Sequence, residues 1–515
     1  MNGRIAPSKM TRLLALAALA MWVATAQAGG ASASDDAALI RVESGSLRGS
    51  VTDGIASYKG IPYAAPPTGD RRWQAPAPPA PWQEVLSAGD YGASCEQAEP
   101  PGRAPFGSRA QTLSEDCLTL NVWAPVAHAA PLPVMVFIHG GGNVGGSGSD
   151  RYYDGSSFAR DGVVLVTLNY RLGLFGFFAH PALAREAGAA PTANFGLLDQ
   201  IAALRWVQAN IGAFGGDPAN VTVFGESAGG EDTVLLATSD AAKGLFARAI
   251  AESASDLWSS FPTMAQAETQ GADIVTRFGL PGDRATAAQL RAIPVDQIAG
   301  FRNDRGSGPI ADGRIMAGPA SSAFEGTPHV PLMIGSNSGD GSLVEGVTNP
   351  SALFPNLSPA AFAAIRKSYG ERGITENGAV AQQLFRDGFF AAPARWEAAR
   401  ARRAGQPAYL YRFDYIFSLF AGRRTAANHG AEIPFVFETF TPSLLSDADR
   451  AMEATMHGCW VAFARTGSPA CPGASAWPRY DPHGGRRMVF DARSSVRDPD
   501  DAAPMNLLEK ELGPR

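Results

Sequence analysis

The segment Val221–Gly230 constrains the fold of this chain more than any other. It begins with an apolar, β-branched run, Val221-Thr-Val-Phe224, which leads directly into Gly225-Glu-Ser-Ala-Gly229 and then into a helical pattern. A Gly-x-Ser-x-Gly turn between a strand and a helix holds its serine in a strained backbone conformation with the hydroxyl exposed above the sheet. The chain contains 57 glycines, so such a match can also arise by composition. The strand and helix around it favour a nucleophile at Ser227.

Alternating strand and helix patterns predict a mostly parallel central sheet covered by helices on both faces. With 45% hydrophobic and 18% charged residues the chain is globular, and one domain over residues 29–515 is expected. Residues 341–388 are expected to form helical excursions over the sheet. The predicted strands are Leu132–Ile138, Val163–Leu168, Asn220–Phe224, Ala249–Ala251, Leu332–Ile334 and Tyr409–Phe413, and the predicted helices include Pro393–Ala404 and a stripe of Leu197, Ile201, Leu204, Gln208 and Ile211.

The N-terminus has the pattern of a secretory signal. Arg4, Lys9 and Arg12 precede the apolar run Leu13–Thr25, which ends at Ala26-Gln-Ala28. A basic start, a short apolar run and an A-x-A site are typical of a cleaved signal peptide and too short for a membrane span. We therefore expect residues 1–28 to be removed and the protein to be secreted or periplasmic. A buried N-terminal helix is the alternative.

The net charge of the chain argues against polyanionic partners. The formal net charge is −6 at pH 7, and loss of the basic N-terminal segment makes it more negative. No basic patch invites nucleic acid or an anionic membrane.

The spacing of histidines and cysteines gives no zinc pattern, so no metal is expected.

Four cysteines in an exported protein can form disulfides. Pairing Cys95 with Cys117 would close a loop of about 22 residues, worth roughly 3 kcal/mol in the chain-entropy model. Cys459 and Cys471 are a second candidate pair, and two unpaired thiols there are nearly as plausible. Sequence alone allows three connectivities.

A glycine triplet supplies a place for developing negative charge. His139-Gly-Gly-Gly142 follows directly on the apolar run Val134–Ile138. Glycines after a strand let bare backbone amides approach an oxyanion. The predicted donors are the amides of Gly141, Gly142 and Ala228. A flexible glycine-rich turn is the alternative.

Two of the seven histidines are candidates for the base that accepts the serine proton. When a Gly-x-Ser-x-Gly elbow carries the nucleophile, the base comes last in chain order, after the acid and the final core strands. His429 follows the predicted strand Tyr409–Phe413 on a loop, which suits this role. His457 lies in a helical run before Trp460 and is interpreted as structural.

The acid should follow a strand between the serine and the histidine. Asp340 comes just past the strand Leu332–Ile334 and is the predicted acid. Glu345 and Asp312 are rivals, although Asp312 has the context of a turn residue. A surface position for Asp340 is the remaining alternative.

Ordered blocks along nearly the whole chain resemble those of the type-B carboxylesterases, the cholinesterase-like family of α/β-hydrolases. The blocks are Tyr58-Lys-Gly-Ile-Pro-Tyr-Ala-Ala-Pro-Pro67, Arg72-Trp73, Ser114-Glu-Asp-Cys-Leu-Thr-Leu-Asn-Val-Trp123, His139–Gly142, Asn169-Tyr-Arg-Leu-Gly-Leu-Phe-Gly176, Phe214-Gly-Gly-Asp-Pro218, Gly225–Gly229 and His429-Gly-Ala-Glu-Ile-Pro434.

The resemblance implies an α/β-hydrolase fold and a serine esterase that acts on small-molecule esters without a cofactor. It favours the disulfide between Cys95 and Cys117. It also places Glu226 near the acyl pocket, in a supporting position, and makes Ser253 a support of the triad.

Three departures from the family pattern stand out. The acid is usually glutamate, whereas here it is Asp340, one methylene shorter. An aromatic residue usually follows the glycine triplet, and Asn143 in its place suggests a substrate pocket suited to polar groups. The acidic pair Glu231-Asp232 stands where small residues are common, and Glu231 lies one helical turn beyond Ser227, where it could tune its electrostatics.

The sequence therefore predicts a serine esterase that works through an acyl-enzyme. Amides, thioesters, carbamates or lactones are alternative substrates, because the same triad serves all acyl groups. A non-catalytic binding module on the same fold is a more distant alternative. Neither the natural ester nor the oligomeric state follows from the sequence.

Overall fold

An eleven-stranded, mostly parallel sheet runs through the described part of the chain, which in this computed structural model comprises residues 38–98, 112–188, 193–255, 257–258, 261–301, 308–316 and 326–514. The predicted signal peptide lies outside these residues. From one edge to the other, the strands are β16 (Ser495–Arg497), β15 (Arg487–Phe490), β14 (Ala408–Phe413), β13 (Leu332–Asn337), β12 (Arg248–Glu252), β11 (Gly216–Glu226), β9 (Leu132–Ile138), β10 (Val164–Leu168), β8 (Thr119–Pro125), β4 (Ile55–Pro62) and β3 (Ser50–Thr52).

The seven strands from β15 to β10 are mutually parallel, and antiparallel pairs occur only toward the two edges of this sheet. Parallel neighbours need crossover connections, which are mostly helices here. Every strand predicted from the sequence is present. For each one, at least one of its two ends lies within two residues of the expected position. Smaller sheets contain β1 (Leu39–Val42), β2 (Gly45–Arg48) and β5 (Leu86–Ser87), and β6 (Ser94–Cys95) with β7 (Leu113–Ser114).

The side chains of each central strand point alternately to the two faces of the sheet, and this divides the core into two layers. On β9, Val134, Val136 and Ile138 pack into one apolar cluster with α5 (Phe195–Asn210), α6 (Ala228–Thr238) and α12 (Ala392–Arg403). The intervening Met135 and Phe137 pack into a second cluster with α2 (Ser156–Arg160), α13 (Ile433–Phe437) and α14 (Asp447–Thr466). Because successive side chains of a strand point to opposite faces, both faces of the sheet are covered.

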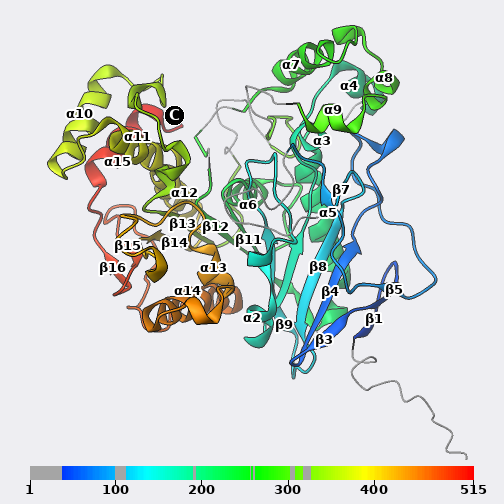
Figure 1. Ribbon diagram of the computed structural model, residues 1–515, viewed down its shortest axis with the longest axis horizontal. Coiled ribbons are helices and arrows are strands. Elements are labelled where there is room, and N and C mark those ends of the chain that lie inside the picture. Colours follow the sequence, from blue (N-terminus) through cyan, green and yellow to red (C-terminus); the bar gives the residue numbers. More distant parts are fainter. Residues whose placement is uncertain are drawn as a thin grey trace, which may run out of the picture.

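Further helices gather in two groups beyond the ends of the sheet, as Figure 1 shows. One group, at the upper right of the view, comprises α3 (Gly173–Gly176), α4 (Pro181–Ala187), α7 (Met264–Thr276), α8 (Ala287–Arg291) and α9 (Val295–Ala299). The other comprises α10 (Pro359–Glu371), α11 (Asn377–Phe385) and α15 (Ala502–Leu512). The second group contains most of the predicted helical excursions.

Both cysteine pairs are joined. Cys95 and Cys117 form a disulfide with a sequence separation of 22 residues, and Cys459 and Cys471 form one with a separation of 12. The connectivity favoured by the family resemblance is the one observed. Among the described helices, none combines the length and the apolar character that crossing a bilayer requires.

Candidate active site

Ser227 stands between β11 and α6 in a backbone conformation that serine rarely adopts. Its φ is 58° and its ψ −125°, and it caps the N-terminus of α6. The Ser227 amide donates to the Glu252 carbonyl at 2.9 Å, which holds the turn against the neighbouring strand β12. A Cβ on Gly229 would lie 2.1 Å from the Ile138 carbonyl oxygen. A Cβ on Gly225 of β11 would lie 2.4 Å from the carbonyl oxygen of Gly229 in α6, so the strand and the helix cross closely at this turn.

The glycine loop lies directly against this elbow. A Cβ on Gly140 would come within 3.0 Å of the Ser227 Cβ. Gly141 has a φ of 109°, and a Cβ there would lie 2.1 Å from the Gly145 carbonyl oxygen. Gly142 also has a positive φ of 65°. A loop this tight needs glycine, and it brings backbone amides to the side of the serine.

His429 and Asp340 meet beyond the ends of two parallel strands. His429 Nδ1 lies 2.8 Å from Asp340 Oδ1. Asp340 is fully buried, and its other oxygen accepts from the Ser253 hydroxyl at 3.0 Å and from the Asn337 amide at 2.8 Å. Three donors therefore fix one carboxylate. The predicted acid, base and supporting serine are brought together.

The rival residues lie elsewhere. Glu345 is exposed, and Asp312 accepts from the backbone amides of a turn, including those of Arg314 and Ile315. His457 is buried in α14, where its Nδ1 lies 2.7 Å from the Val436 carbonyl oxygen. Within the described part of the chain, the His429 ring contacts Asp340, Glu226 and Phe390, and none of these three rivals.

Glu226 approaches the other nitrogen of the same imidazole. Its Oε1 lies 3.1 Å from His429 Nε2, although the angles make no hydrogen bond and Nε2 has no hydrogen-bond partner among the described residues. Burial raises the pKa of Glu226 to about 7. Burial alone would lower the pKa of His429, but the carboxylates of Glu226 and Asp340 outweigh it and raise that pKa to about 9.

Two further buried acids lie behind this pair, and the sequence did not identify them. Glu252 accepts a hydrogen bond from Trp460 Nε1 at 3.0 Å, and burial raises its pKa. Glu432 accepts from the Asn337 side-chain amide, and burial raises its pKa to about 8. Each stands beside a residue that the sequence did single out: Glu252 precedes Ser253, and Glu432 lies in the His429 loop.

Asn143 turns its side chain into the interior. It is 2% exposed, has a φ of 58°, and its Nδ2 donates to Asp232 Oδ1 at 3.3 Å. Asp232 lies on α6, five residues beyond Ser227. The amide of Asn143 therefore connects the glycine loop to the helix that starts at the serine.

The helical excursion contributes an aromatic neighbour to the site. The ring of Phe390, from the turn Arg386–Ala391, lies 5.1 Å from the His429 ring. The short helix Asp340–Val344 packs on α11, and a Cβ on Gly341 would lie 2.1 Å from the Gln382 carbonyl oxygen. The helix that begins with Asp340 is thus held against α11.

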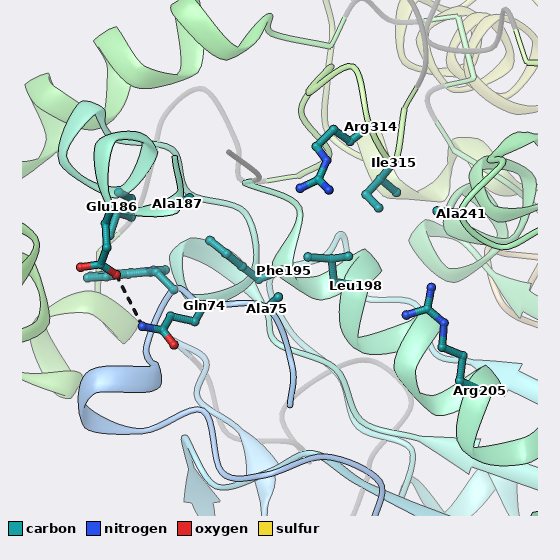
Figure 2. Close-up of a pocket in the computed structure, with 12 residues that line it drawn as sticks. Gln74, Ala75, Glu186, Ala187, Phe195, Leu198, Arg205, Ala241, Arg314 and Ile315 are labelled. Atoms are coloured by element: carbon teal, nitrogen blue, oxygen red, sulfur yellow. Dashed lines mark hydrogen bonds between the residues drawn. The ribbon is translucent and has the colours of Figure 1, made fainter. Parts of the chain in front are cut away.

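A cavity lies away from these residues. It measures about 510 Å³ and is shown in Figure 2, with Phe195 and Leu198 of α5 on one side and Arg314 and Ile315 near them. Its described lining contains none of the predicted site residues. A much smaller space of about 10 Å³ lies beside Glu226 and Tyr153. Within the described ranges no cluster of three or more His, Cys, Asp or Glu side chains could hold a metal ion.

The chain is similar to known proteins over most of its length. A model of the carboxylesterase family matches residues 36–507. The fumonisin B1 esterase of Sphingopyxis macrogoltabida is 38% identical over 479 residues, covering 88% of this chain and 87% of the relative. The para-nitrobenzyl esterase of Bacillus subtilis (strain 168) is 35% identical over 486 residues, covering 89% and 96%.

Solved structures show the same architecture. A structure of PNB esterase has a TM-score of 0.76 at 32% identity and covers 91% of this chain and 99% of its own. A carboxylesterase of Geobacillus stearothermophilus at pH 6.2 has a TM-score of 0.77 at 31% identity and covers 92% and 100%. The predicted α/β-hydrolase fold is confirmed.

Proposed function

Because this chain belongs to the carboxylesterase family, whose members are serine hydrolases of carboxylic esters, we propose that Ser227 is its nucleophile, His429 its general base and Asp340 its acid. The observation that carries the assignment is the 2.8 Å contact between His429 Nδ1 and Asp340 Oδ1. It fixes the tautomer in which Nδ1 carries the proton and Nε2 is free to accept one.

The reaction has two halves. Ser227 Oγ attacks the ester carbonyl carbon while His429 Nε2 takes the hydroxyl proton, and a tetrahedral intermediate forms. The imidazolium then gives this proton to the leaving alkoxide, so that an alcohol departs and an acyl-serine remains. Water enters, gives a proton to His429 and attacks the acyl carbon, and the carboxylic acid leaves as Ser227 regains its proton.

Backbone amides carry the charge that develops on the carbonyl oxygen. The amides of Gly141, Gly142 and Ala228 are the proposed donors of the oxyanion hole. Ala228 begins α6, so its amide also has the positive end of the helix dipole behind it. The close approach of the glycine loop to Ser227 supports this assignment.

Supporting residues complete the proposal. Ser253 donates to the second oxygen of Asp340 and thereby orients the acid. Glu226 would stabilise the imidazolium that forms as the serine proton is taken, because its Oε1 faces Nε2. Asn143 is proposed to shape the pocket through its link to Asp232 rather than by forming an open wall.

The substrate is proposed to be an ester of a small molecule. The relatives named for fumonisin B1 and for para-nitrobenzyl esters differ in the esters that their names state, and both support small-molecule esters as the substrate class. The net charge of −6 gives no reason to expect a polyanionic substrate.

The decisive experiment measures hydrolysis of p-nitrophenyl acetate, butyrate and octanoate by the purified protein and by Ser227→Ala. We expect turnover by the wild type and a loss of about 10⁴-fold or more in kcat for Ser227→Ala. Comparing an ester with its matched amide then separates an esterase from an amidase. A folded Ser227→Ala variant that keeps wild-type turnover would overturn the assignment.

Export after cleavage near Ala28 is also part of the proposal. The basic and apolar pattern of residues 1–28 and the two disulfides support it. N-terminal sequencing of the protein recovered from the periplasm or medium of an expressing bacterium should begin at Gly29. Recovery of the intact N-terminus in the cytoplasm alone would contradict export.

A further inference from the structure

Three buried polar side chains from three different elements form a connected network behind the glycine loop. Asn143 Nδ2 donates to Asp232 Oδ1 at 3.3 Å, and Gln200 Nε2 donates to Asp232 Oδ2 at 2.5 Å. Asn143 follows the glycine triplet, Asp232 is on α6 and Gln200 is on α5. Asp232 and Gln200 are completely buried, and Asn143 nearly so. Solvent therefore does not compete for these hydrogen bonds.

The network holds Asn143 at a strained point of the loop. Its φ of 58° is a left-handed conformation, which asparagine tolerates better than most residues. Its carbonyl accepts from the Gly173 amide at 2.7 Å, while its side chain is held by Asp232. Asn143 is thus anchored on both sides, directly after Gly142.

If packing were the only role of residue 232, a buried carboxyl group would be unfavourable there. Burial raises its pKa to about 7, and the side chains that counter burial are the amides of Gln200 and Asn143. A buried carboxyl held by amides is less favourable than a small residue at the same place. What the carboxyl adds is a fixed acceptor that reaches from α6 to the loop.

We propose that Asp232 and Asn143 are positioning residues of the oxyanion hole, which tie the loop bearing the Gly141 and Gly142 amides to the helix bearing the Ala228 amide. This inference rests on the proposed function. The amide donors come from two separate elements, and stabilisation of an oxyanion requires them to keep one spacing. The hydrogen bond between Asn143 and Asp232 is a side-chain link that spans those two elements.

The consequence is a specific kinetic defect when the link is cut. Neither residue is proposed to touch the substrate. Losing either side chain should therefore reduce stabilisation of the transition state more than binding of the substrate in its ground state. Asn143→Gly removes the amide and keeps the left-handed backbone, and Asp232→Ala removes the acceptor. For both variants we expect kcat on p-nitrophenyl butyrate to fall about tenfold, with KM within about twofold of the wild type.

A conservative variant should rescue the link. The Oδ1 of Asn143 and the Oε1 of Gln200 have no hydrogen-bond partner among the described residues. An amide at position 232 can accept from one of these side chains and donate to the oxygen of the other once an amide group turns over. Asp232→Asn should therefore keep kcat within about threefold of the wild type.

The matched control lies on the same helix. Thr238 is buried at the far end of α6, where its hydroxyl donates to the Leu235 carbonyl. Thr238→Val removes this buried hydrogen bond without touching the glycine loop, and kcat should stay unchanged. If Asp232→Ala loses its cooperative unfolding transition, Asp232→Ser replaces it.

An oxyanion analogue provides a readout that packing alone does not move. A trifluoromethyl ketone adds to the serine and places an oxyanion in the hole. Its affinity for Asn143→Gly and Asp232→Ala should fall by the same factor as kcat/KM. A double variant should lose no more than either single variant, because both cut the same link.

Several results would overturn the inference. These are unchanged kcat and analogue affinity in Asn143→Gly, losses that multiply in the double variant, a rise in KM at unchanged kcat, or an equal loss in Thr238→Val. They are distinguishable from failure of the proposed function, which would appear as turnover that survives Ser227→Ala.

Discussion

His429 Nε2 lies 3.1 Å from Glu226 Oε1, while Nδ1 of the same ring lies 2.8 Å from Asp340 Oδ1. The imidazole is therefore placed between two carboxyl groups in a buried site. Both negative charges favour the protonated ring, which is the form that exists when the serine proton has been taken. The ring must be neutral to act as the proposed base, so we expect the two carboxyls to set the pH at which the enzyme becomes active.

Glu226→Gln should move the acidic limb of the pH profile to lower pH. His429 must be deprotonated to accept the serine proton, so activity falls as pH drops through its pKa. Removing the Glu226 carboxylate lowers that pKa, and the limb of kcat/KM should shift down by on the order of one pH unit. Glu453 is a buried acid on α14, and Glu453→Gln is the control, which should leave the limb in place. A shift to higher pH in Glu226→Gln would contradict this account.

Asp340→Asn should nearly abolish turnover. The amide NH2 can donate to Nδ1 and so favour the tautomer with the proton on Nε2, and the amide has no negative charge to stabilise the imidazolium. A loss in kcat of about 10⁴-fold is therefore expected. Glu345→Gln, at the exposed rival position, should change kcat by less than about twofold. Steady-state kinetics on p-nitrophenyl butyrate compare the two. Equal losses in both would mean that the acid is not Asp340 alone.

Gly141→Ala should lose activity through a collision in the oxyanion loop. The added Cβ would lie 2.1 Å from the Gly145 carbonyl oxygen, so the loop must move. We expect kcat to fall by about 10² to 10³-fold, as when an oxyanion donor is lost. Gly54→Ala is the control, because Gly54 also has a positive φ of 77° but no atom within 4 Å. It should cost about 1 kcal/mol of stability and leave kcat unchanged.

Replacing Cys95 and Cys117 together by serine should lower the free energy of unfolding by about 3 kcal/mol, from the entropy of the loop that the disulfide closes. The disulfide joins residues separated by 22 positions, and both side chains are buried. Urea unfolding followed by circular dichroism measures the change. Reduction of the wild type also opens the disulfide between Cys459 and Cys471, so the loss there should be at least as large. An unchanged unfolding midpoint in both samples would refute the estimate.

Asp232→Asn should gain stability relative to the wild type as pH rises. The pKa of Asp232 is raised to about 7 in the fold, so the ionised form is disfavoured there. Between the ordinary pKa of aspartate, about 4, and this raised value, rising pH removes stability from the wild type. The variant lacks this group, and the difference in Tm should grow in its favour from pH 5 to pH 8. A difference that is constant with pH would show that Asp232 does not titrate in this range.

The sequence predicts those features that depend on the hydrophobic period within each element and on the order of the elements along the chain. Strand β9 and the elbow at Ser227 follow from short apolar runs ended by glycines, and these signals are local. The partners of side chains behind the site were not predictable in the same way. The place of Asn143 after the glycine triplet can be read from the sequence, but the hydrogen bond of its amide to Asp232 depends on the left-handed backbone there, which no local pattern predicts. Likewise, only the register of β12 beside β11 brings Glu252 behind the elbow.

The loops that carry the proposed acid and base also share a backbone connection. Gly339 pairs with Asn428, the Gly339 amide donates to the Ala427 carbonyl at 2.7 Å, and the Asn337 side chain donates to the Asn428 carbonyl at 2.9 Å. The two loops are therefore joined just before Asp340 and His429, next to the sheet. Sequence changes farther along the helical excursion during evolution leave this connection intact. The excursion can therefore diverge in this scaffold without rebuilding the proposed proton-transfer pair.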